Sequence, residues 1–249
     1  MPNLAVECSG MNPTIGLFSN GQLIAKRQPD EALNSVQGMA VAIQTLMEST
    51  EVKEFSGDSD AFATLEWIAT TVGPGSFTGL RVGLATVKAI AFALRIPVVE
   101  VDTLEAIAVG AAAELGGERP KIVVPVINAF RKQVFSATWL FTERDRNCLV
   151  PSHVQDADVW SAKPTSLDAD HPVCVAGPGL SSYQPTGEAY SAAPPEIWEP
   201  TVEAIAAIGA EQAGLGKFVD ATILKPNYLR KSAAEEKRQT QSASTNRLQ

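Results

Sequence analysis

The stretch from Trp67 to Ile107 constrains the fold more than any other part of the chain. It reads WIATTVGPGSFTGLRVGLATVKAIAFALRIPVVEVDTLEAI. The apolar run Trp67–Val72 predicts a strand, and a glycine-proline loop then leads into a helix expected over Thr78–Leu94. Pro97 ends that helix, and Val98–Val101 predicts a second strand. A strand, a helix and a strand within about thirty residues form a βαβ unit, which has parallel strands and a right-handed crossover.

The loop Gly73-Pro74-Gly75-Ser76 invites a phosphate-binding interpretation, and its spacing argues against one. A P-loop needs two glycines five apart followed by Lys and Ser or Thr, whereas Thr78 stands five after Gly73 and no lysine follows it. A dinucleotide loop needs glycine where Thr78 stands. The free N–H groups of a helix N-terminus can still attract an anion. The alternative is a tight turn that lets the helix pack closely on its strand.

The helix after this loop has several distinct faces. Apolar residues at helical spacing predict a core stripe of Leu80, Leu84, Val87, Ala91 and Leu94. Gly79 and Gly83 are four apart, and each costs up to about 1 kcal/mol relative to alanine, which indicates close approach by another backbone. Arg81, Lys88 and Arg95 share another side. Two interpretations stay open for this surface: a solvated basic face within one domain, or a docking surface for a second chain.

The residues from Val72 to Ala108 closely resemble the signature of the bacterial TsaB family, also called YeaZ. Two shorter segments support this. VVPVINAFRKQVF, at Val123–Phe135, resembles the family's strand-turn-strand around an Ile-Asp-Ala-Arg segment. PNYLR, at Pro226–Arg230, resembles its C-terminal Pro-x-Tyr-Leu-Arg. The order and spacing of these segments extend the resemblance over nearly the whole chain.

The resemblance implies an α/β fold of the actin-like ATPase type (ASKHA, ribonuclease H-like) with two similar subdomains. It implies a non-catalytic scaffold or activator that binds a TsaD-like catalytic subunit in forming the threonylcarbamoyl group on N6 of adenosine 37 of tRNAs that read ANN codons. We also expect a TsaE-like ATPase in the same complex, tRNA binding only through the complex, and a homodimer when the chain is alone. No catalytic residue, cofactor or metal ion is assigned to this chain.

Family resemblance places the subunit interface on two helices, the one after the glycine loop and an amphipathic helix expected over Asp30–Glu48. The predicted interface residues are Leu33, Val36, Gly79, Arg81, Gly83, Ala85 and Lys88. In the sharpest form of this prediction, the region of Gly83 and Ala85 meets a TsaD-like subunit, or a second copy when that subunit is absent.

Two segments depart from the family pattern. Relatives usually carry Asp-Thr-Ser at the end of the first strand, where this chain has Glu7-Cys8-Ser9. Glutamate is a methylene longer than aspartate, and cysteine is a poor hydrogen-bond donor. Relatives typically carry Asp where this chain has Asn128, which lacks the charge that a metal or catalytic role needs. We therefore assign no role to Glu7.

The search for catalytic patterns favours an interaction subunit over an enzyme. His153 and His171 are the two histidines, and they form neither HxxxH nor HExxH. The catalytic TsaD family has a fold that resembles this one but carries a His-x-x-x-His metal site. This chain has no such site, which argues that it does not carry out the transfer reaction. Ser76 is not in a G-x-S-x-G elbow. The alternatives are an ASKHA-type ATPase or small-molecule kinase, and a dinucleotide-binding domain.

The remaining sequence predicts a mixed α/β chain with a boundary near Thr103. We expect an N-terminal subdomain over 1–103 with the interface helices, a C-terminal subdomain over 104–230, and a disordered polar tail over 231–249. Strands are expected at Leu4–Val6, Thr14–Ser19, Gln22–Gln28, Lys121–Ile127, Gln133–Phe141, Leu149–Val154 and Val173–Ala176. Helices are expected from Thr103, capped by Asp102, and over Val202–Ala213; Thr50–Asp60 and Tyr183–Pro200 are expected to be loops.

Charge and composition limit the setting in which this chain works. A net charge of −8 and a pI of about 4.9 make it a poor platform for binding tRNA alone, because that affinity depends on neutralised phosphates. No signal peptide and no uninterrupted apolar run of about eighteen residues are seen, so we expect no membrane span and a cytoplasmic protein. Cys8, Cys148 and Cys174 are scattered and predict no disulfide framework.

Overall fold

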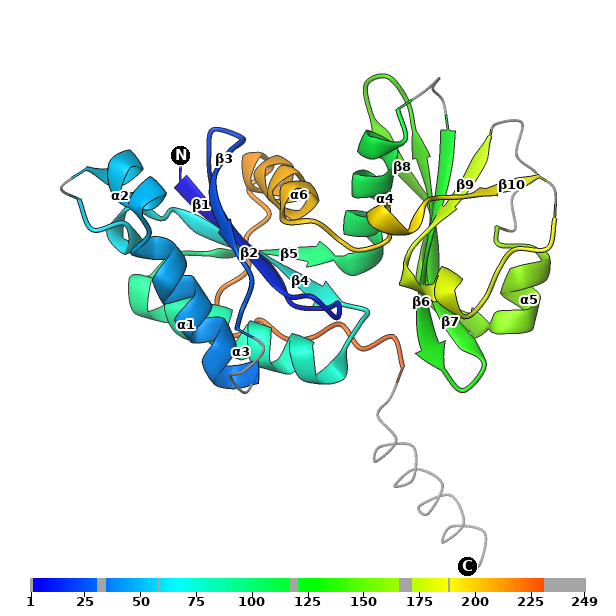
Figure 1. Cartoon of the computed structure of the whole chain (residues 1–249), viewed down its shortest axis with the longest axis horizontal. Coiled ribbons are helices and arrows are strands. Elements are labelled where there is room, and N and C mark those ends of the chain that lie inside the picture. Colours follow the sequence, from blue (N-terminus) through cyan, green and yellow to red (C-terminus); the bar gives the residue numbers. More distant parts are fainter. Residues whose placement is uncertain are drawn as a thin grey trace, which may run out of the picture.

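Two five-stranded sheets stand side by side, and one helix, α4, lies between them (Figure 1). The computed structural model describes residues 2–30, 35–57, 59–116, 121–165, 172–187 and 189–230, without the side chains of residues 35–37. The tail predicted over 231–249 lies outside these ranges. The helices are α1 (Ser35–Met47), α2 (Thr50–Ser56), α3 (Phe77–Leu94), α4 (Thr103–Glu114), α5 (Ala157–Ala162) and α6 (Val202–Gly214).

The first sheet has the strand order β3-β2-β1-β4-β5. Its strands are β1 (Pro2–Glu7), β2 (Thr14–Ser19), β3 (Gln22–Arg27), β4 (Trp67–Gly73) and β5 (Val98–Asp102). β1 pairs antiparallel with β2 and parallel with β4, and β4 pairs parallel with β5, so the predicted βαβ unit is confirmed. Asn20 and Gly21, with φ of 50° and 78°, join β2 to β3 in a two-residue hairpin turn, for which Asn-Gly is the strongest short sequence signal.

The second sheet repeats this pattern in the order β10-β9-β6-β7-β8. Its strands are β6 (Lys121–Phe130), β7 (Gln133–Phe141), β8 (Arg146–Asp156), β9 (Val173–Ala176) and β10 (Tyr190–Ala192). Again the first strand pairs antiparallel with the second and parallel with the fourth. The third pairs with the second and the fifth with the fourth in the same senses as before. The prediction of two similar α/β subdomains is therefore confirmed.

Helices cover both faces of the first sheet, because successive side chains of a strand point to opposite faces. Leu4, Val6 and Ile68 form one core with α1 and α3. Ala5 and Ala69 form a second core with α4 and α6 on the other face. Strands β1, β2 and β4 are buried on both faces, which is why they are largely apolar in sequence, whereas the edge strand β3 is mostly exposed.

Three local predictions are wrong. The segment Thr50–Asp60 is not a loop throughout, because α2 forms over its first residues, with the Ser49 hydroxyl capping Val52 N–H and the Val52 side chain fully buried. The segment Tyr183–Pro200 contains β10, which adds to the edge of the second sheet. Helix α5 was not predicted; it forms where Trp160 is fully buried and its indole N–H donates to Ser136 Oγ at 3.2 Å.

Helix α3 fits closely against the end of β1. A Cβ at Gly83 would lie 2.5 Å from Cys8 Sγ, one at Gly75 would lie 2.8 Å from Ser9 Cβ, and one at Gly79 would overlap the Cys8 carbonyl oxygen. Real Cβ contacts essentially never come below 3.0 Å. The backbone that these glycines admit therefore belongs to the same chain, and glycine is required at each of the three positions.

Gly83 itself is therefore not accessible to a partner in this structure, and the contact of the Gly83 and Ala85 region with another subunit stays a prediction that only Ala85 could make directly. Gly83 is buried, and the row that it forms with Gly79 faces Cys8 in the core. The spacing of the two glycines correctly indicated a close approach by another backbone segment. It could not indicate whether that segment belongs to the same chain or to a second one. Ala85, by contrast, is exposed on the other side of α3.

Helix α3 also has the length and apolar composition of a membrane-spanning helix. In the fold, its Leu80, Leu84 and Val87 side chains are buried in the core of the first sheet. Arg81 lies exposed on the opposite side, and Lys88 is half-buried there. This division is typical of a core helix in a sheet protein.

Residues 218–230 form a C-terminal strap that crosses from the first sheet to the second (Figure 1). Val219 exchanges two backbone hydrogen bonds with Val98 of β5, and Asn227 N–H donates to the Val72 carbonyl at 2.7 Å. At the far end, the Arg230 guanidinium donates to the Ala129 carbonyl of β6. The strap thus runs along α3 and ends beside the second sheet.

Arg146 of β8 joins the second sheet to the helices of the first. Its Nε and Nη2 both lie 2.9 Å from the Glu105 Oε1 atom on α4, and its Nη1 pairs with Glu211 on α6. Asp102 caps α4 as predicted, but Glu105 pairs with Arg146. Helix α6 packs on the first sheet, so the division into 1–103 and 104–230, which stays a prediction, would separate α6 from that sheet.

We expect Arg146→Ala to lower the free energy of unfolding by about 3 kcal/mol, because it leaves the Glu105 carboxylate, which is only 14% exposed, without its partner. The matched control is Lys26→Ala, which also removes an ion pair between a strand and α6, but at a site where the Lys26 side chain is 57% exposed. That control should cost under about 1 kcal/mol. Urea unfolding measures both. Equal small losses would contradict the role of Arg146, and Glu105→Gln should recover stability in the Arg146→Ala background.

We expect Gly83→Ala to lower the free energy of unfolding by about 1–3 kcal/mol, because overlap with Cys8 outweighs the higher helix propensity of alanine. Gly110→Ala on α4 is the matched control, since its nearest neighbour would lie 3.8 Å away, at ordinary contact distance. That control should be neutral or stabilising by up to about 1 kcal/mol. If thermal unfolding shows the same change in both variants, the close fit of α3 is refuted.

Candidate functional site

The end of β1 lies next to the glycine loop and is the first candidate site, because that loop is where a phosphate could be expected to bind. The Glu7 side chain is buried there, and its Oε1 atom accepts hydrogen bonds from Ser9 N–H at 2.6 Å, Ser9 Oγ at 2.5 Å and Gly10 N–H at 3.1 Å. These are local donors that hold the turn after β1. These hydrogen bonds explain the buried Glu7 carboxyl group, because it holds the turn in place.

A second carboxyl group borders the same turn. An added methyl group at Gly10 would lie 2.7 Å from Glu199 Oε2 and 3.6 Å from Glu7 Oε2. Burial, opposed by hydrogen bonds from Ser9 and Gly10 and helped by the Glu199 charge, raises the pKa of Glu7 to about 7. Burial also raises the pKa of Glu199. A phosphate brought to Gly10 would therefore meet two carboxyl groups, which repel an anion when they are ionised and supply no positive charge when they are protonated.

The donors of the glycine loop are used within the protein. Ser76 N–H donates to the Ser9 carbonyl at 2.7 Å, and Ser76 Oγ accepts from Gly79 N–H at 3.2 Å as the cap of α3. An anion at a helix N-terminus needs these N–H groups free. The geometry favours the interpretation of the loop as a tight turn that packs α3 on β1.

Within the described ranges, no group of three or more His, Cys, Asp and Glu side chains is placed to hold a metal ion. His153 lies half-buried on β8, where its Nδ1 is 2.9 Å from the Pro151 carbonyl oxygen. His171 lies outside the described residues. Asn128 has a structural part, since its Oδ1 accepts from Phe130 N–H at 2.7 Å and its Nδ2 donates to Ser182 Oγ.

The outer face of α3, made by Phe77, Arg81, Ala85 and Lys88, is the second candidate site. The Arg81 guanidinium lies 3.7 Å from the centre of the Phe77 ring, and its Nε donates to the Tyr228 hydroxyl at 2.9 Å. The Phe77 and Tyr228 rings are stacked with centres 5.2 Å apart. The guanidinium is therefore a fixed cation, because it is attracted to the face of one ring and hydrogen-bonds to the hydroxyl of the other.

The rest of this face is apolar and shallow. Ala85 is exposed, and Lys88 Nζ donates to the Leu224 carbonyl of the strap at 3.4 Å. Arg81, Ala85 and Lys88 line a shallow pocket of about 330 Å³ together with strap residues Leu224, Pro226 and Tyr228. The strap therefore forms one surface with α3.

The structure thus brings together three of the seven predicted interface residues: Arg81, Ala85 and Lys88. Gly79 and Gly83 face the core, Leu33 lies outside the described residues, and the side chain of Val36 is not described. Sequence reasoning missed Phe77 and Tyr228. Tyr228 lies in the Pro-x-Tyr-Leu-Arg segment, but the sequence of that segment does not indicate that Tyr228 contacts α3.

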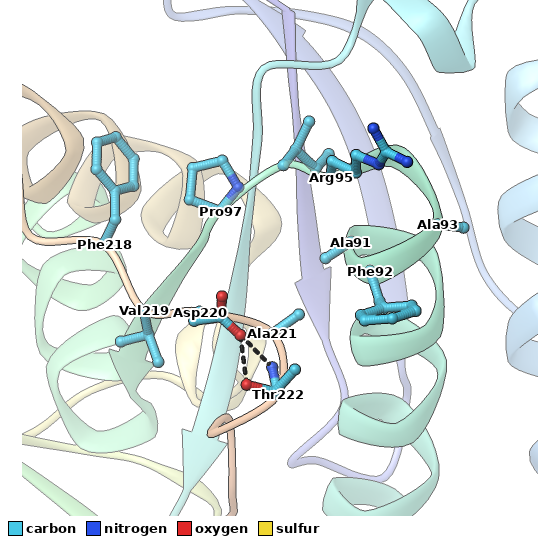
Figure 2. Close-up of a pocket in the computed structure, with 11 residues that line it drawn as sticks. Ala91, Phe92, Ala93, Arg95, Pro97, Phe218, Val219, Asp220, Ala221 and Thr222 are labelled. Carbon is cyan, nitrogen blue, oxygen red and sulfur yellow. Dashed lines mark hydrogen bonds between the residues drawn. The ribbon is translucent and has the colours of Figure 1, made fainter.

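A larger hollow of about 680 Å³ lies at the C-terminal end of α3, between its last turn and the start of the strap (Figure 2). Phe92, which is 68% exposed, and Phe218 stand on opposite sides of it. The Asp220 carboxylate accepts from Thr222 N–H and Oγ, which holds its pKa below the usual range. The walls of the hollow offer apolar contact, the Arg95 side chain and one carboxylate that is already hydrogen-bonded, which together make no catalytic set.

Comparison with known proteins supports the resemblance. A family model described as TsaD: tRNA N6-adenosine threonylcarbamoyltransferase matches residues 36–155. The chain is 27% identical over 245 residues to the tRNA threonylcarbamoyladenosine biosynthesis protein TsaB of Bacillus subtilis, covering 95% of this chain and 97% of that one. It is 26% identical over 171 residues to TsaB of Escherichia coli, covering 66% and 71%.

A solved structure of YeaZ from Pseudomonas aeruginosa superposes with a TM-score of 0.72 at 22% identity, over 92% of this chain and 99% of that one. The agreement extends over both sheets, and the fold is the expected two-subdomain fold of the actin-like ATPase type. Sequence similarity along nearly the full length and this shared fold agree, and both support the resemblance of the chain to the TsaB (YeaZ) family.

Proposed function

We propose that this chain is a non-catalytic partner subunit that binds a TsaD-like protein through the outer face of α3, in the threonylcarbamoyl modification of tRNA adenosine. The relatives are named for tRNA threonylcarbamoyladenosine biosynthesis, which supports a part in that pathway. The observation that carries the proposal is the exposed surface of Arg81, Ala85 and Lys88 beside the strap. A fixed cation beside small apolar side chains suits a protein partner, since arginine and aromatic residues are enriched in interface cores.

The proposal extends to the rest of the assembly. Helix α1 packs against α3 and exposes Ala40 and Val41, so it can widen the same surface. We propose that a second copy of the chain occupies this surface when the TsaD-like protein is absent, and that a TsaE-like ATPase joins the complex. The complex would hold the tRNA, and it would work in the cytoplasm. Co-purification from the native cell, followed by identification of a TsaD-like protein, tests the main partner.

The competing function is an ATPase or small-molecule kinase of the same fold. The two carboxyl groups around Gly10 and the occupied donors of Ser76 argue against nucleotide phosphates at the end of β1. We therefore expect the isolated chain neither to hydrolyse ATP nor to modify tRNA. ATP turnover that persists after removal of partner proteins, and that a substitution in this chain abolishes, would favour the competitor.

We expect Ala85→Glu to weaken binding of the TsaD-like subunit at least about tenfold, because it places a carboxylate in the centre of the contact. The isolated variant should keep its melting temperature, since Arg81 and Lys88 stand four residues before and three residues after the new carboxylate on the same helix face. Ala113→Glu, at an exposed position on α4, is the matched control and should bind normally. Calorimetric titration checks all three proteins. Normal binding by Ala85→Glu would remove this face from the interface.

We expect Glu7→Gln to change stability with pH and to leave partner binding unchanged. The folded pKa of Glu7 is about 7, above the ordinary 4.5, so the stability that the protonated carboxyl supports is complete below pH 4.5 and is lost as the pH rises to 7. Glutamine carries no proton to lose, so the variant should gain up to about 3 kcal/mol relative to the wild type over this range. Chemical unfolding at several pH values measures the gain. A constant difference between the two proteins would contradict a buried, protonated Glu7.

A further inference from the structure

The turn between β6 and β7 presents three large side chains in an unusual backbone conformation. Phe130, Arg131 and Lys132, here called the β6–β7 tip, have φ of 59°, 54° and 59°. All three side chains are exposed, and Phe130 is 72% exposed. Side chains larger than hydrogen rarely adopt this left-handed region, because Cβ approaches the following carbonyl oxygen.

The β2–β3 hairpin of the same chain shows which residues stabilise a two-residue turn with positive φ. The β2–β3 hairpin uses Asn20 and Gly21, the residues that suit two left-handed positions best. The β6–β7 tip places Arg131 and Lys132 at its two central positions. Turn stability does not explain this choice, and strained backbone concentrates at functional sites.

The tip is held from several sides. Asn128 Oδ1 accepts from Phe130 N–H, Ala157 N–H donates to the Lys132 carbonyl at 2.8 Å, and Arg230 of the strap donates to the Ala129 carbonyl. The end of the strap lies beside this end of β6 (Figure 1). Nearby Asp156 is engaged as the cap of α5, where it accepts from the N–H groups of Asp158 and Val159. The tip therefore presents one exposed aromatic ring and two cations from a fixed backbone.

We propose that the β6–β7 tip contacts RNA in the assembled complex, with Arg131 and Lys132 at phosphates and Phe130 stacked on an unpaired base. Cations supply affinity for phosphates, and an exposed aromatic ring supplies stacking on a base. An acidic peptide would use the cations but would not need the exposed ring. Because the whole chain carries a net charge of −8, we expect the tip to add one local contact to RNA that a partner already holds. That the RNA is tRNA rests on the proposed function.

The test compares tRNA binding by complexes that contain the wild-type chain or a tip variant. Arg131→Glu with Lys132→Glu reverses both cations, and Lys53→Glu with Lys217→Glu makes the same charge change at exposed positions on α2 and after α6. The probe is an unmodified tRNA transcript, measured by fluorescence anisotropy at several salt concentrations. The tip reversal should weaken binding about tenfold or more and reduce the slope of log affinity against log salt by about one per lost phosphate contact. Phe130→Ala should weaken binding without changing the slope.

A second variant separates an RNA contact from a structural turn. Arg131→Asn with Lys132→Gly installs the turn residues of the β2–β3 hairpin, so it should raise the melting temperature while it weakens tRNA binding. Unchanged tRNA affinity in this variant, or equal loss in the Lys53 and Lys217 control, would overturn the proposal. Competition by polyglutamate as effective as that by tRNA would assign the tip to an acidic protein partner and also overturn it.

Partner binding is measured on the same samples by pull-down with the TsaD-like protein. If the wild-type chain fails to bind that protein, the proposed function fails, and tRNA binding is then measured with the full chain alone at low salt. In that assay a loss confined to the tip variants supports the RNA contact, and equal binding by all variants refutes it. The two proposals can therefore fail separately.

Discussion

The rest of the structure depends on the close contact between α3 and the end of β1. Gly75, Gly79 and Gly83 have no side chains to hold the helix away from Cys8 and Ser9. This contact occupies the Ser76 N–H with the Ser9 carbonyl and brings the loop against the turn that Glu7 holds. It also determines which side of α3 faces outward. The same contact therefore fills the space between α3 and the end of β1, and leaves the other side of α3 as the face proposed for a partner.

The two halves of the chain repeat this arrangement with different results. Gly73 and Gly177 both begin a Gly-Pro-Gly turn after the fourth strand of their sheets, with φ of 118° and 128°. In the first half a long helix follows the turn and covers the end of β1. In the second half a short 3-10 helix, Pro178–Ser181, follows instead. No helix like α3 covers the connection between β6 and β7 in this second half, and its three large side chains are exposed.

Local signals in the sequence were sufficient for most of the fold. Apolar runs, the Asn20-Gly21 pair and the βαβ spacing each act over a few residues, so the strands and the main helices were predicted near their observed positions. Helix α2 was missed because it spans seven residues and depends on the burial of Val52, which is a tertiary contact. The candidate site was predicted only in part for the same reason. Arg81 and Tyr228 are 147 positions apart, and no local pattern reports that they meet.

The strap has a consequence for how the protein matures. It supplies one wall of the surface beside Arg81 and Lys88, and it comes from residues 218–230, after both sheets have been translated. A chain still emerging from the ribosome can form α3 against the first sheet while the Arg81 guanidinium lacks the Tyr228 hydroxyl. The surface is completed only when the strap has been synthesised and Leu224, Pro226 and Tyr228 lie beside α3. The order of synthesis therefore determines when the surface is complete: unfinished chains expose an incomplete surface, and finished chains expose the complete one.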